Sequence, residues 1–468
     1  MGRKRRLLLN TGLMTCSALL TRAISMAFQA WLASRIGAAG IGLYQIMGSV
    51  TALFSAIAVS GIRFTVTRLV SEEAGRNNGH GVNGAVLRCL CYALFFGFAA
   101  GAALFFFAEP LGFLWAGDAR SVAGLRIAAA GLPILALSSV FSGYFTASGN
   151  VWKAVLVQFF EQLLSVASVV MLLMRCRTGD LGQACASVIG GNVAAAAMTV
   201  LIWIPVYRAD QKRFGKNGLP SPGMTRRMLW IAIPLAVSSY TRTALGTMEH
   251  LLIPRGLRLA GCTAEQALEQ YGIVHGMALP AVLFPACLLF ALADLIVPEL
   301  TQAQVQGNQM HILRMVRKTR RCTLLYAAVS AAVLIGLSQT IAVRVFHTPE
   351  AAKYIRILSP LVPVMNLDTA TDGCLRGLGK QGHVMLINVL DAALGVALVL
   401  LLLPRQGITG YLGMIWITEC GNLLLSTAAL HLALHSKKNC RPGNTRAAGS
   451  LWENHGIREC RRASGKAR

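Results

Sequence analysis

Charged residues are scarce in this chain. They make up 13% of its 468 residues, about half of the roughly 25% found in soluble proteins. Hydrophobic residues make up 55%, and the mean hydropathy is +0.56. A composition so poor in charge excludes an ordinary soluble domain and places the chain in the membrane class. Any charge inside an apolar stretch therefore needs an explanation.

Metal-binding and nucleotide-binding motifs are also absent. The twelve cysteines are scattered singly, and the closest pair, Cys89 and Cys91, would point in different directions from a helix. Without a CxxC pair or a Cys/His cluster, we expect neither a zinc site nor a disulfide framework. The stretch RGLGKQG (376–382) lacks the spacing and the hydroxyl of a GxxxxGK[ST] phosphate loop. No metal, ATPase or cofactor is therefore predicted.

Large aqueous loops are missing as well. The longest internal loop, 207–227, is rich in Lys and Arg and contains a single acid, Asp210. A membrane phosphatase or glycosyltransferase would need a carboxylate or His cluster in such a loop. We therefore expect no enzyme, and a membrane enzyme acting on lipid phosphates is the least favoured alternative. The N-terminal MGRKRRLLLNTGLM enters an apolar span with no small-residue cleavage site, which predicts a transmembrane helix rather than a signal peptide.

What the chain does have is a series of apolar segments. A helix needs about 20 apolar residues to cross the hydrocarbon core of a bilayer. Twelve segments meet this length, which predicts an all-α polytopic membrane protein; the seventh and tenth are the most polar. The expected spans are 7–33, 41–67, 86–108, 122–145, 151–174, 184–206, 228–253, 271–298, 322–345, 354–376, 383–403 and 411–434.

The basic residues are distributed unevenly between the two sides of these spans. The net charge is +25, which in a soluble protein would suggest a nucleic acid as partner. Here thirty Lys and Arg residues fall on the side of the termini and eleven on the other side. Because cytoplasmic loops carry the excess of Lys and Arg, both termini are predicted to be cytoplasmic in a multi-pass cell-membrane protein. We therefore expect membrane lipids around the chain, no nucleic acid, and a monomer.

The two halves of the sequence resemble each other. Residues 125–173 align without gaps with 355–403 at an offset of 230, and 13 of the 49 positions are identical. An offset of 231 also aligns Arg63 with Asp294. The matched positions that punctuate helices or carry charge are Pro133 with Pro363, Gly143 with Gly373, Gly149 with Gly379, and Glu161 with Asp391.

This repeat predicts two lobes of six spans each. Repeats with an even number of spans insert the same way up, and binding sites tend to lie between such lobes. The polar and basic C-terminal segment is expected to be disordered. The predicted organisation is an N-terminal lobe over 1–206, a cytoplasmic linker over 207–227, a C-terminal lobe over 228–434 and a basic cytoplasmic tail over 435–468.

The stretch ASRIGAAGIGLYQIMGSVTALFSAIAVSGIRFTVTRLVSEE (33–73) resembles the signature of the stage V sporulation protein B family. That family belongs to the MOP superfamily of polysaccharide flippases, which also contains MATE drug antiporters and MurJ-type flippases. The resemblance covers residues 1 to about 435. It implies two lobes in a V, with spans 1, 2, 7 and 8 facing a central cleft. It also implies a flippase moving an undecaprenyl-linked peptidoglycan or polysaccharide precursor to the outer leaflet, in spore cortex or cell-wall synthesis. A MATE-type cation-coupled drug antiporter remains the alternative.

Three arginines interrupt apolar spans: Arg22, Arg63 and Arg242. A charge at the bilayer centre costs about 2.5–3.5 kcal/mol on insertion scales, so it usually faces a cavity or a partner. A guanidinium presents a planar fork of donors that matches phosphate oxygens. We predict that the three arginines line the cleft and bind the pyrophosphate of the substrate. The alternative is that they snorkel to the interface, above all Arg63 near the end of its span.

Acids within spans concentrate in the second half of the chain. These acids could bind Na⁺ or H⁺, and they are Asp294, Asp368, Asp372, Asp391 and Glu419, against Glu161 alone in the first half. The candidates for the ion site are Asp294, Asp368 and Asp372, and Asp294 is also a candidate ion-pair partner of Arg63. The alternative is that Asp368 and Asp372 cap or kink the polar tenth span. The membrane potential is a further source of drive, since one negative charge moving outward releases about 2.3 kcal/mol per 100 mV.

Overall fold

The computed structural model describes residues 3–76, 78–115, 118–176, 180–211, 223–306 and 308–435. Helices joined by short turns make up this part of the chain, and no strand occurs in it. The predicted tail lies almost wholly outside the described residues, as does the middle of the predicted linker. The α-helices are α1 (Arg3–Val59), α2 (Ile62–Gly75), α3 (Gly79–Pro110), α4 (Ser121–Ala147), α5 (Val151–Arg175), α6 (Leu181–Gln211), α7 (Met224–Leu259), α8 (Ala264–Tyr271), α9 (Leu279–Leu283), α10 (Ala286–Val305), α11 (Gln309–Thr340), α12 (Ala351–Leu358), α13 (Val362–Gly377) and α14 (Gln381–His435).

Within the described residues, seven helical stretches are long and apolar enough to cross a membrane. Two of them, Leu19–Gly75 and Gln381–Leu434, are far longer than one crossing needs. Each contains two helices joined at a kink, at Gly37 (φ 68°) and Gly407 (φ 57°), where glycine accepts the left-handed backbone. The seven stretches therefore contain nine helical passes, and the more polar α7, α8–α10 and α12–α13 are the other three. The described residues thus form the all-α polytopic membrane fold that the sequence predicts, with twelve passes.

The second half repeats the helix bounds of the first half at an offset of 230. Starts of helices recur in this way, and so do irregular features. A left-handed glycine precedes both α5 and α14, at Gly149 (φ 73°) and Gly379 (φ 71°). The other matched features are the first residues of α3 and α11 (79 and 309), of α4 and α12 (121 and 351) and of α5 and α14 (151 and 381), and the π-helical turns 111–115 and 341–345.

The same offset holds at the turn that follows α2 and α10. Asn78 and Asn308 each cap the next helix by accepting a hydrogen bond from the backbone N–H three residues on, at 2.9 and 3.1 Å. Because α2 and α10 run unbroken up to these turns, Ala293 occupies the place equivalent to Arg63. The offset of 231 that aligned Arg63 with Asp294 is therefore wrong in this region.

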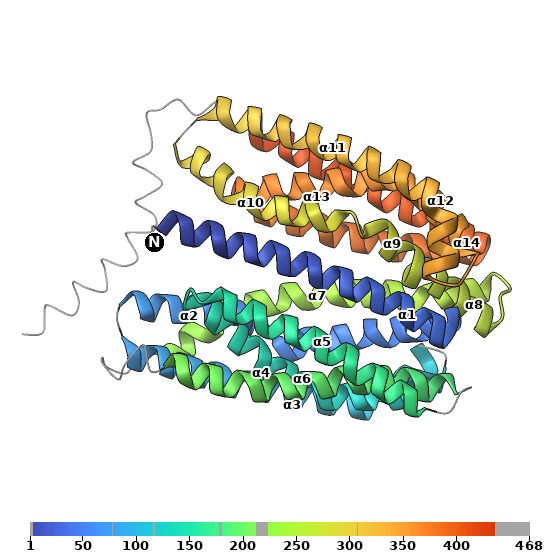
Figure 1. Cartoon of the computed structure of the whole chain (residues 1–468), viewed down its shortest axis with the longest axis horizontal. Coiled ribbons are helices and arrows are strands. Elements are labelled where there is room, and N and C mark those ends of the chain that lie inside the picture. Colours follow the sequence, from blue (N-terminus) through green and yellow to red (C-terminus); the bar gives the residue numbers. More distant parts are fainter. Residues whose placement is uncertain are drawn as a thin grey trace, which may run out of the picture.

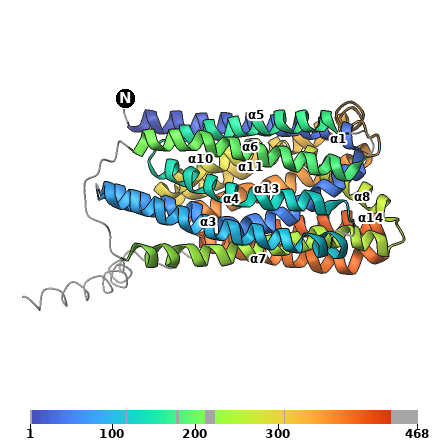
Figure 2. The same cartoon turned by 90° about the horizontal axis from the view of Figure 1, so that it is seen from below.

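The helices form two bundles, the N lobe (α1–α6) and the C lobe (α7–α14). Figure 1 shows the first half of α1 running between α10–α14 on one side and α2–α6 on the other. In Figure 2, α5 and α6 lie at one edge of the molecule, and α7 and α14 lie together at the opposite edge. The N-terminus lies at the same end as the α2–α3 and α10–α11 turns, the N-terminal end, and α8 lies at the other end, the α8 end (Figure 1).

At the α8 end the two lobes meet backbone to backbone. A Cβ added at Gly42 would lie 2.1 Å from the carbonyl oxygen of Leu268, and one added at Gly272 would lie 2.0 Å from that of Ala38. Leu268 and Gly272 follow Ala38 and Gly42 by 230 residues, so the contact is reciprocal, as a two-fold axis between the lobes requires. Only glycine fits such an approach. In this conformation the lobes are therefore closed together at the α8 end.

Candidate functional site

A polar cavity of about 610 Å³, the N-lobe pocket, lies within the first bundle. The kink at Gly37 folds α1 back on itself, so Gln29 and Gln45, eight residues before and after it, line the same space. Helices α5 and α6 supply the remaining wall. The lining residues are Thr21, Ser25, Phe28, Gln29, Leu32, Tyr44, Gln45, Gln158, Glu161, Gln162, Ser165 and Asn192.

Two hydrogen bonds fix parts of this wall. Ser165 Oγ on α5 donates to Asn192 Oδ1 on α6 at 2.6 Å. Gln29 Nε2 donates across to the C lobe, to the carbonyl oxygen of Gly276 at 2.7 Å. The pocket is thus tied to the opposite lobe at Gln29, so a movement between the lobes would reach its wall.

Other polar groups of the N-lobe pocket have no partner. Gln45, Glu161 and Gln162 are partly buried, and none of them has a hydrogen-bond partner within the part of the chain that the structure describes. Buried polar groups normally find partners, because leaving one unsatisfied costs about 1–3 kcal/mol. Their donors and acceptors therefore face the cavity, where water or a ligand would satisfy them.

A second cavity of about 260 Å³, the interlobe cavity, lies where α1 meets α7. Thr247 Oγ1 on α7 donates to the carbonyl oxygen of Ser49 on α1 at 2.9 Å and holds its wall together. Gln45 lines both cavities, so they adjoin each other. The lining residues are Gln45, Ser49, Ala52, Arg242, Thr243, Gly246, Thr247, His250 and His275, which come from spans 2, 7 and 8.

The three predicted arginines have different surroundings. Arg242 lines the interlobe cavity. Arg22 is exposed and lies three residues before Ser25 and seven before Gln29, on the same face of α1 as these lining residues of the N-lobe pocket. Arg63 is exposed and lines neither cavity. The structure therefore associates Arg242 and Arg22 with the cavities and leaves Arg63 apart from them.

Arg63 follows a break in the second span, which the sequence had predicted to be one continuous helix. Ser60 (φ 44°) and Gly61 (φ 70°) both have left-handed backbone. For a serine this costs roughly 1–2 kcal/mol. Two hydroxyl groups hold the break in place, since Ser60 Oγ lies 2.8 Å from Tyr92 Oη on α3 and 2.6 Å from Tyr240 Oη on α7. The break links the N lobe to the C lobe near the middle of the second span.

Asp368 and Asp372 lie together on α13 and face α14. Asn422 Nδ2 donates to Asp368 Oδ2 at 3.1 Å, and Ser426 Oγ donates to Asp372 Oδ1 at 3.5 Å. Arg376 lies 3.9 Å from Asp372. The other carboxylate oxygen of Asp368 is buried without a partner in the described structure. The third predicted acid, Asp294, falls within α10, but its side chain lies outside the described residues.

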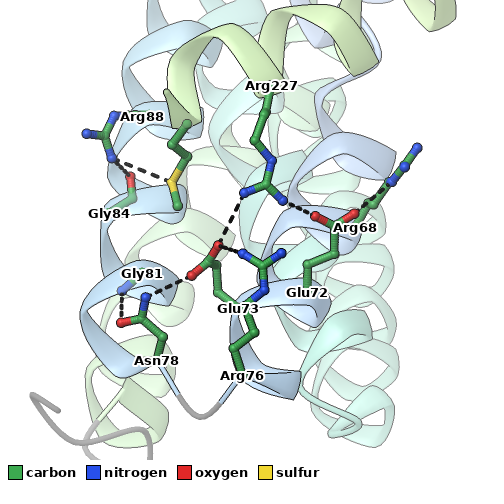
Figure 3. A network of polar contacts seen from close by, with 10 residues as sticks. Arg68, Glu72, Glu73, Arg76, Asn78, Gly81, Gly84, Arg88 and Arg227 are labelled. Atoms are coloured by element: carbon green, nitrogen blue, oxygen red, sulfur yellow. Dashed lines mark hydrogen bonds and ion pairs between the residues drawn. The ribbon is translucent and has the colours of Figure 1, made fainter. Parts of the chain in front are cut away.

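At the N-terminal end, ion pairs join α2 to the start of α7 (Figure 3). Arg227 on α7 pairs with Glu72 and lies 3.5 Å from Glu73. The side chain of Glu73 is only 1% exposed, and it also accepts from Asn78 at 2.9 Å and pairs with Arg76 at 3.4 Å. Removing Arg227 would take one cation from the buried Glu73 carboxylate, at a cost below that of breaking a fully buried pair, because the Arg227 side chain is 35% exposed to solvent. This network therefore holds the two lobes together along the α2–α7 seam.

Residues 7–304 match the family described as Polysaccharide biosynthesis protein. The chain belongs to this family. Among curated relatives, Stage V sporulation protein B of Bacillus subtilis (strain 168) is 20% identical over 439 residues, which cover 93% of this chain and 84% of the relative. Sporulation protein YkvU of the same organism is 21% identical over 424 residues, which cover 90% of this chain and 93% of the relative.

The fold of this polysaccharide biosynthesis protein is similar to that of solved MATE-family multidrug transporters of the MOP superfamily. An inward-facing one superposes with a TM-score of 0.72 at 12% identity, covering 92% of this chain and 100% of the other. An outward-facing one gives a TM-score of 0.61 at 13% identity, covering 94% and 98%. At these identities the likeness shows the fold alone. Family and fold together identify a multi-pass membrane transporter or flippase.

The sequence reasoning missed several residues of the site in this family member. The acid Glu249, whose carboxylate lies beside Gly395 on α14, and the amides Gln45 and Gln162 were not among the predicted residues. Glu249 is a charged residue inside an apolar span, so a search for membrane-embedded charges would have found it, whereas the neutral amides give no comparable signal. In the described residues no three His, Cys, Asp or Glu side chains converge to hold a metal ion.

Proposed function

We propose that the protein is a flippase for an undecaprenyl-pyrophosphate-linked saccharide, a peptidoglycan or polysaccharide precursor, in spore cortex or cell-wall synthesis. The observation that carries this proposal is the pair of adjoining polar cavities, one with Arg242 on its wall, inside a membrane-embedded bundle. A hydrophilic headgroup needs such a path through the bilayer, whereas its lipid tail can remain in the hydrocarbon.

In this proposal the arginines hold the pyrophosphate. Arg242 would bind it in the interlobe cavity, and Arg22 would meet it at the edge of the N-lobe pocket. A guanidinium stays charged at any relevant pH and can bind phosphate with two parallel hydrogen bonds. Arg63 would join them only after a movement of α2, for which the break at Ser60 and Gly61 supplies a pivot.

Transport would follow the alternating opening of the two ends. With both termini in the cytoplasm, the α8 end faces outward, and Gly42 and Gly272 would seal it while the substrate enters from inside. The two cytoplasmic seams differ: the α2–α7 seam has the Glu72–Arg227 pair, whereas the positions equivalent to Glu72 and Glu73 on α10 are Gln and Ala, residues 302 and 303. We propose that the lipid tail passes along the seam between α1 and α10, which lacks these acids.

The drive would come from a cation or from the membrane potential. Asp368 and Asp372 on α13, and Asp294 on α10, are the proposed sites for H⁺ or Na⁺. A pyrophosphate of roughly two negative charges moving outward would gain about 4.6 kcal/mol per 100 mV of inside-negative potential. Neither source requires ATP.

The proposal is tested in proteoliposomes that contain the full chain and an undecaprenyl-pyrophosphate-linked saccharide. Movement of the saccharide between leaflets is followed with an impermeant lectin. We expect Arg242→Lys to slow transport by about 10-fold, since losing a bidentate contact costs about 1.4 kcal/mol, and Arg242→Ala to slow it further. Arg317→Lys, at an exposed position on α11, is the matched control. Transport that is unaffected by Arg242→Ala would contradict the proposal.

Arg63 needs its own comparison. If it binds phosphate, Arg63→Lys should impair transport, because an ammonium lacks the planar fork. If it snorkels, lysine will serve as well as arginine, and Arg63→Ala will only lower the amount of folded protein.

The second candidate is a cation-coupled antiporter of drugs or other small molecules, which the MATE-like fold favours. The same proteoliposomes distinguish the two. Accumulation of a cationic dye driven by an H⁺ or Na⁺ gradient, with no movement of the lipid-linked saccharide, would replace the flippase proposal by the antiporter.

A further inference from the structure

The N-lobe pocket has more polar groups than a phosphate site needs, and most of them are uncharged. We infer that it is the saccharide subsite of the proposed flippase, where the sugar hydroxyl groups of the headgroup bind while the pyrophosphate stays at the arginines. This inference rests on the proposed function and adds the place and the chemistry of sugar recognition.

The side chains of the pocket suit sugar hydroxyls. A hydroxyl group both donates and accepts hydrogen bonds, and a carboxamide offers two donors and two acceptor lone pairs. Five carboxamides line the pocket, together with one carboxylate, Glu161. Ligand pockets typically measure 300–1,000 Å³, and this one measures about 610 Å³. The carboxamides are Gln29, Gln45, Gln158, Gln162 and Asn192.

The pairing of these groups leaves room for a ligand. Asn192 and Gln29 are engaged with Ser165 and Gly276. Gln45, Gln162 and Glu161 have no partner among the described residues and line the open part of the pocket. A site built only for structure would satisfy such groups internally, because unsatisfied polar groups are costly in the membrane.

The position of the pocket fits a headgroup that spans two sites. Gln45 lines both the N-lobe pocket and the interlobe cavity, which contains Arg242. Arg22 lies one turn before Ser25 on the face of α1 that lines the pocket. A pyrophosphate between these arginines would therefore place the attached sugar beside Gln45 and Gln162.

The equivalent region of the C lobe argues against a cation as the occupant of the N-lobe pocket. Ser138 and Ser142 of the N lobe correspond, at the offset of 230, to Asp368 and Asp372. Neither serine lines the N-lobe pocket, but Ser142 Oγ accepts a hydrogen bond from the lining residue Gln158 at 3.3 Å, so the place equivalent to Asp372 adjoins the pocket wall and is uncharged. The pocket itself has one acid, Glu161. One carboxylate among amides is a weak cation site and a good acceptor for sugar hydroxyls.

The test compares two lipids that differ only in the sugar. Undecaprenyl pyrophosphate and undecaprenyl pyrophosphate linked to a disaccharide are titrated into the purified full-length protein in nanodiscs. Gln162→Leu removes the carboxamide and nearly keeps the volume. Gln183→Leu, at an exposed position on α6, is the matched control. Thermal unfolding of each variant verifies that it is folded.

We expect the wild type to bind the saccharide-linked lipid more tightly than undecaprenyl pyrophosphate. Gln162→Leu should weaken binding of the saccharide-linked lipid about 5-fold, and adding Gln45→Leu should bring the total to about 25-fold, given about 1 kcal/mol for each lost hydrogen bond. Binding of undecaprenyl pyrophosphate should change by less than about 2-fold. Arg242→Lys should weaken both lipids alike.

Other outcomes would overturn the inference. If Gln162→Leu weakens both lipids equally, or neither, the pocket is not a sugar subsite, although the flippase proposal survives. The same holds if the wild type binds the two lipids with equal affinity. If the wild type binds neither lipid, the proposed function fails, and the subsite fails with it.

Discussion

The N-lobe pocket and the region of the C lobe around Asp368 and Asp372 lie in corresponding parts of two copies of one helical frame. Where the N lobe has Ser138 and Ser142, the C lobe has Asp368 and Asp372. Both lobes keep an asparagine at the same place on the last span. Asn192 accepts from a serine hydroxyl at 2.6 Å, whereas Asn422 donates to the carboxylate of Asp368 at 3.1 Å.

A single small residue illustrates how the two regions diverged. Ser165 of the N lobe corresponds to Gly395 of the C lobe. A Cβ added at Gly395 would lie 2.9 Å from Glu249 Oε2, so the glycine makes room for an acid that the N lobe lacks. Some residues that shape the backbone recur in both lobes, such as Gly149 with Gly379 and Pro133 with Pro363, while the side chains facing the cavities differ. The comparison teaches that the duplicated frame is kept for folding and that the two lobes do different chemistry, which we propose to be sugar recognition and cation binding.

The largest expected effect comes from making the C lobe resemble the N lobe. Asp368→Asn combined with Asp372→Asn should lower cation-driven transport by about 100-fold, on roughly 1.4 kcal/mol for each carboxylate. Binding of the lipid-linked saccharide should persist. The measurement is transport into proteoliposomes under an imposed H⁺ or Na⁺ gradient. Ser138→Ala with Ser142→Ala is the matched N-lobe control. An equal loss of cation-driven transport in this control would contradict the proposal that the cation binds in the C lobe.

The next largest effect is expected at the contact between the lobes near their two-fold axis, where equivalent substitutions in the two lobes should have equal effects. Gly42→Ala and Gly272→Ala each place a methyl group about 2 Å from a backbone carbonyl oxygen of the other lobe. Overpacking of this kind costs about 1–3 kcal/mol, so we expect both variants to separate the lobes at the α8 end by a similar amount. Thermal unfolding and the spacing of spin labels across that end would measure this. Gly48→Ala, which meets nothing within 4 Å, is the control.

A smaller effect is expected from exchanging residues at the divergent position. Gly395→Ser should destabilise the protein by about 1 kcal/mol, because the Glu249 carboxylate at the end of its flexible side chain must move away from the added group. Ser165→Gly removes the hydrogen bond to Asn192 and should cost about 1 kcal/mol. Chemical unfolding in detergent compares them. If Gly395→Ser were neutral, the glycine would not be needed to accommodate the acid.

The last prediction concerns orientation and should leave function unchanged. The two lobes should have the same orientation in the membrane. The N-terminal end of each lobe is predicted to face the cytoplasm, and the α8 end is predicted to face outward. In a chain whose exposed native cysteines are replaced by alanine, Glu265→Cys near the α8 end should react with an impermeant maleimide in intact cells. Arg314→Cys near the N-terminal end should react only after permeabilisation. The reverse pattern would contradict the cytoplasmic termini.

Much of the fold could be predicted from the sequence because apolar length and helix punctuation act locally. The twelve spans follow from runs long enough to cross a bilayer, and the offset of 230 is visible in pairs such as Gly149 and Gly379. The break at Ser60 and Gly61 was not predicted, because its hydroxyl partners, Tyr92 and Tyr240, are distant in sequence.

The candidate site was predicted less well than the fold. Charged residues stand out in an apolar span, so Arg242 and Asp368 were found from the sequence. Neutral amides such as Gln45 and Gln162 do not stand out, and only their convergence makes them a site. That convergence depends on the kink at Gly37, which folds two parts of α1 around one cavity.

The sequence by itself therefore determined that this is a membrane protein of two related lobes, because the bilayer demands continuous apolar helices and duplication leaves a constant offset. The tertiary structure decided which polar residues share a cavity, that Asp368 and Asp372 face Asn422 and Ser426, and that the lobes close on Gly42 and Gly272. These features depend on how distant helices pack, and packing brings together residues whose spacing along the chain gives no sign of it.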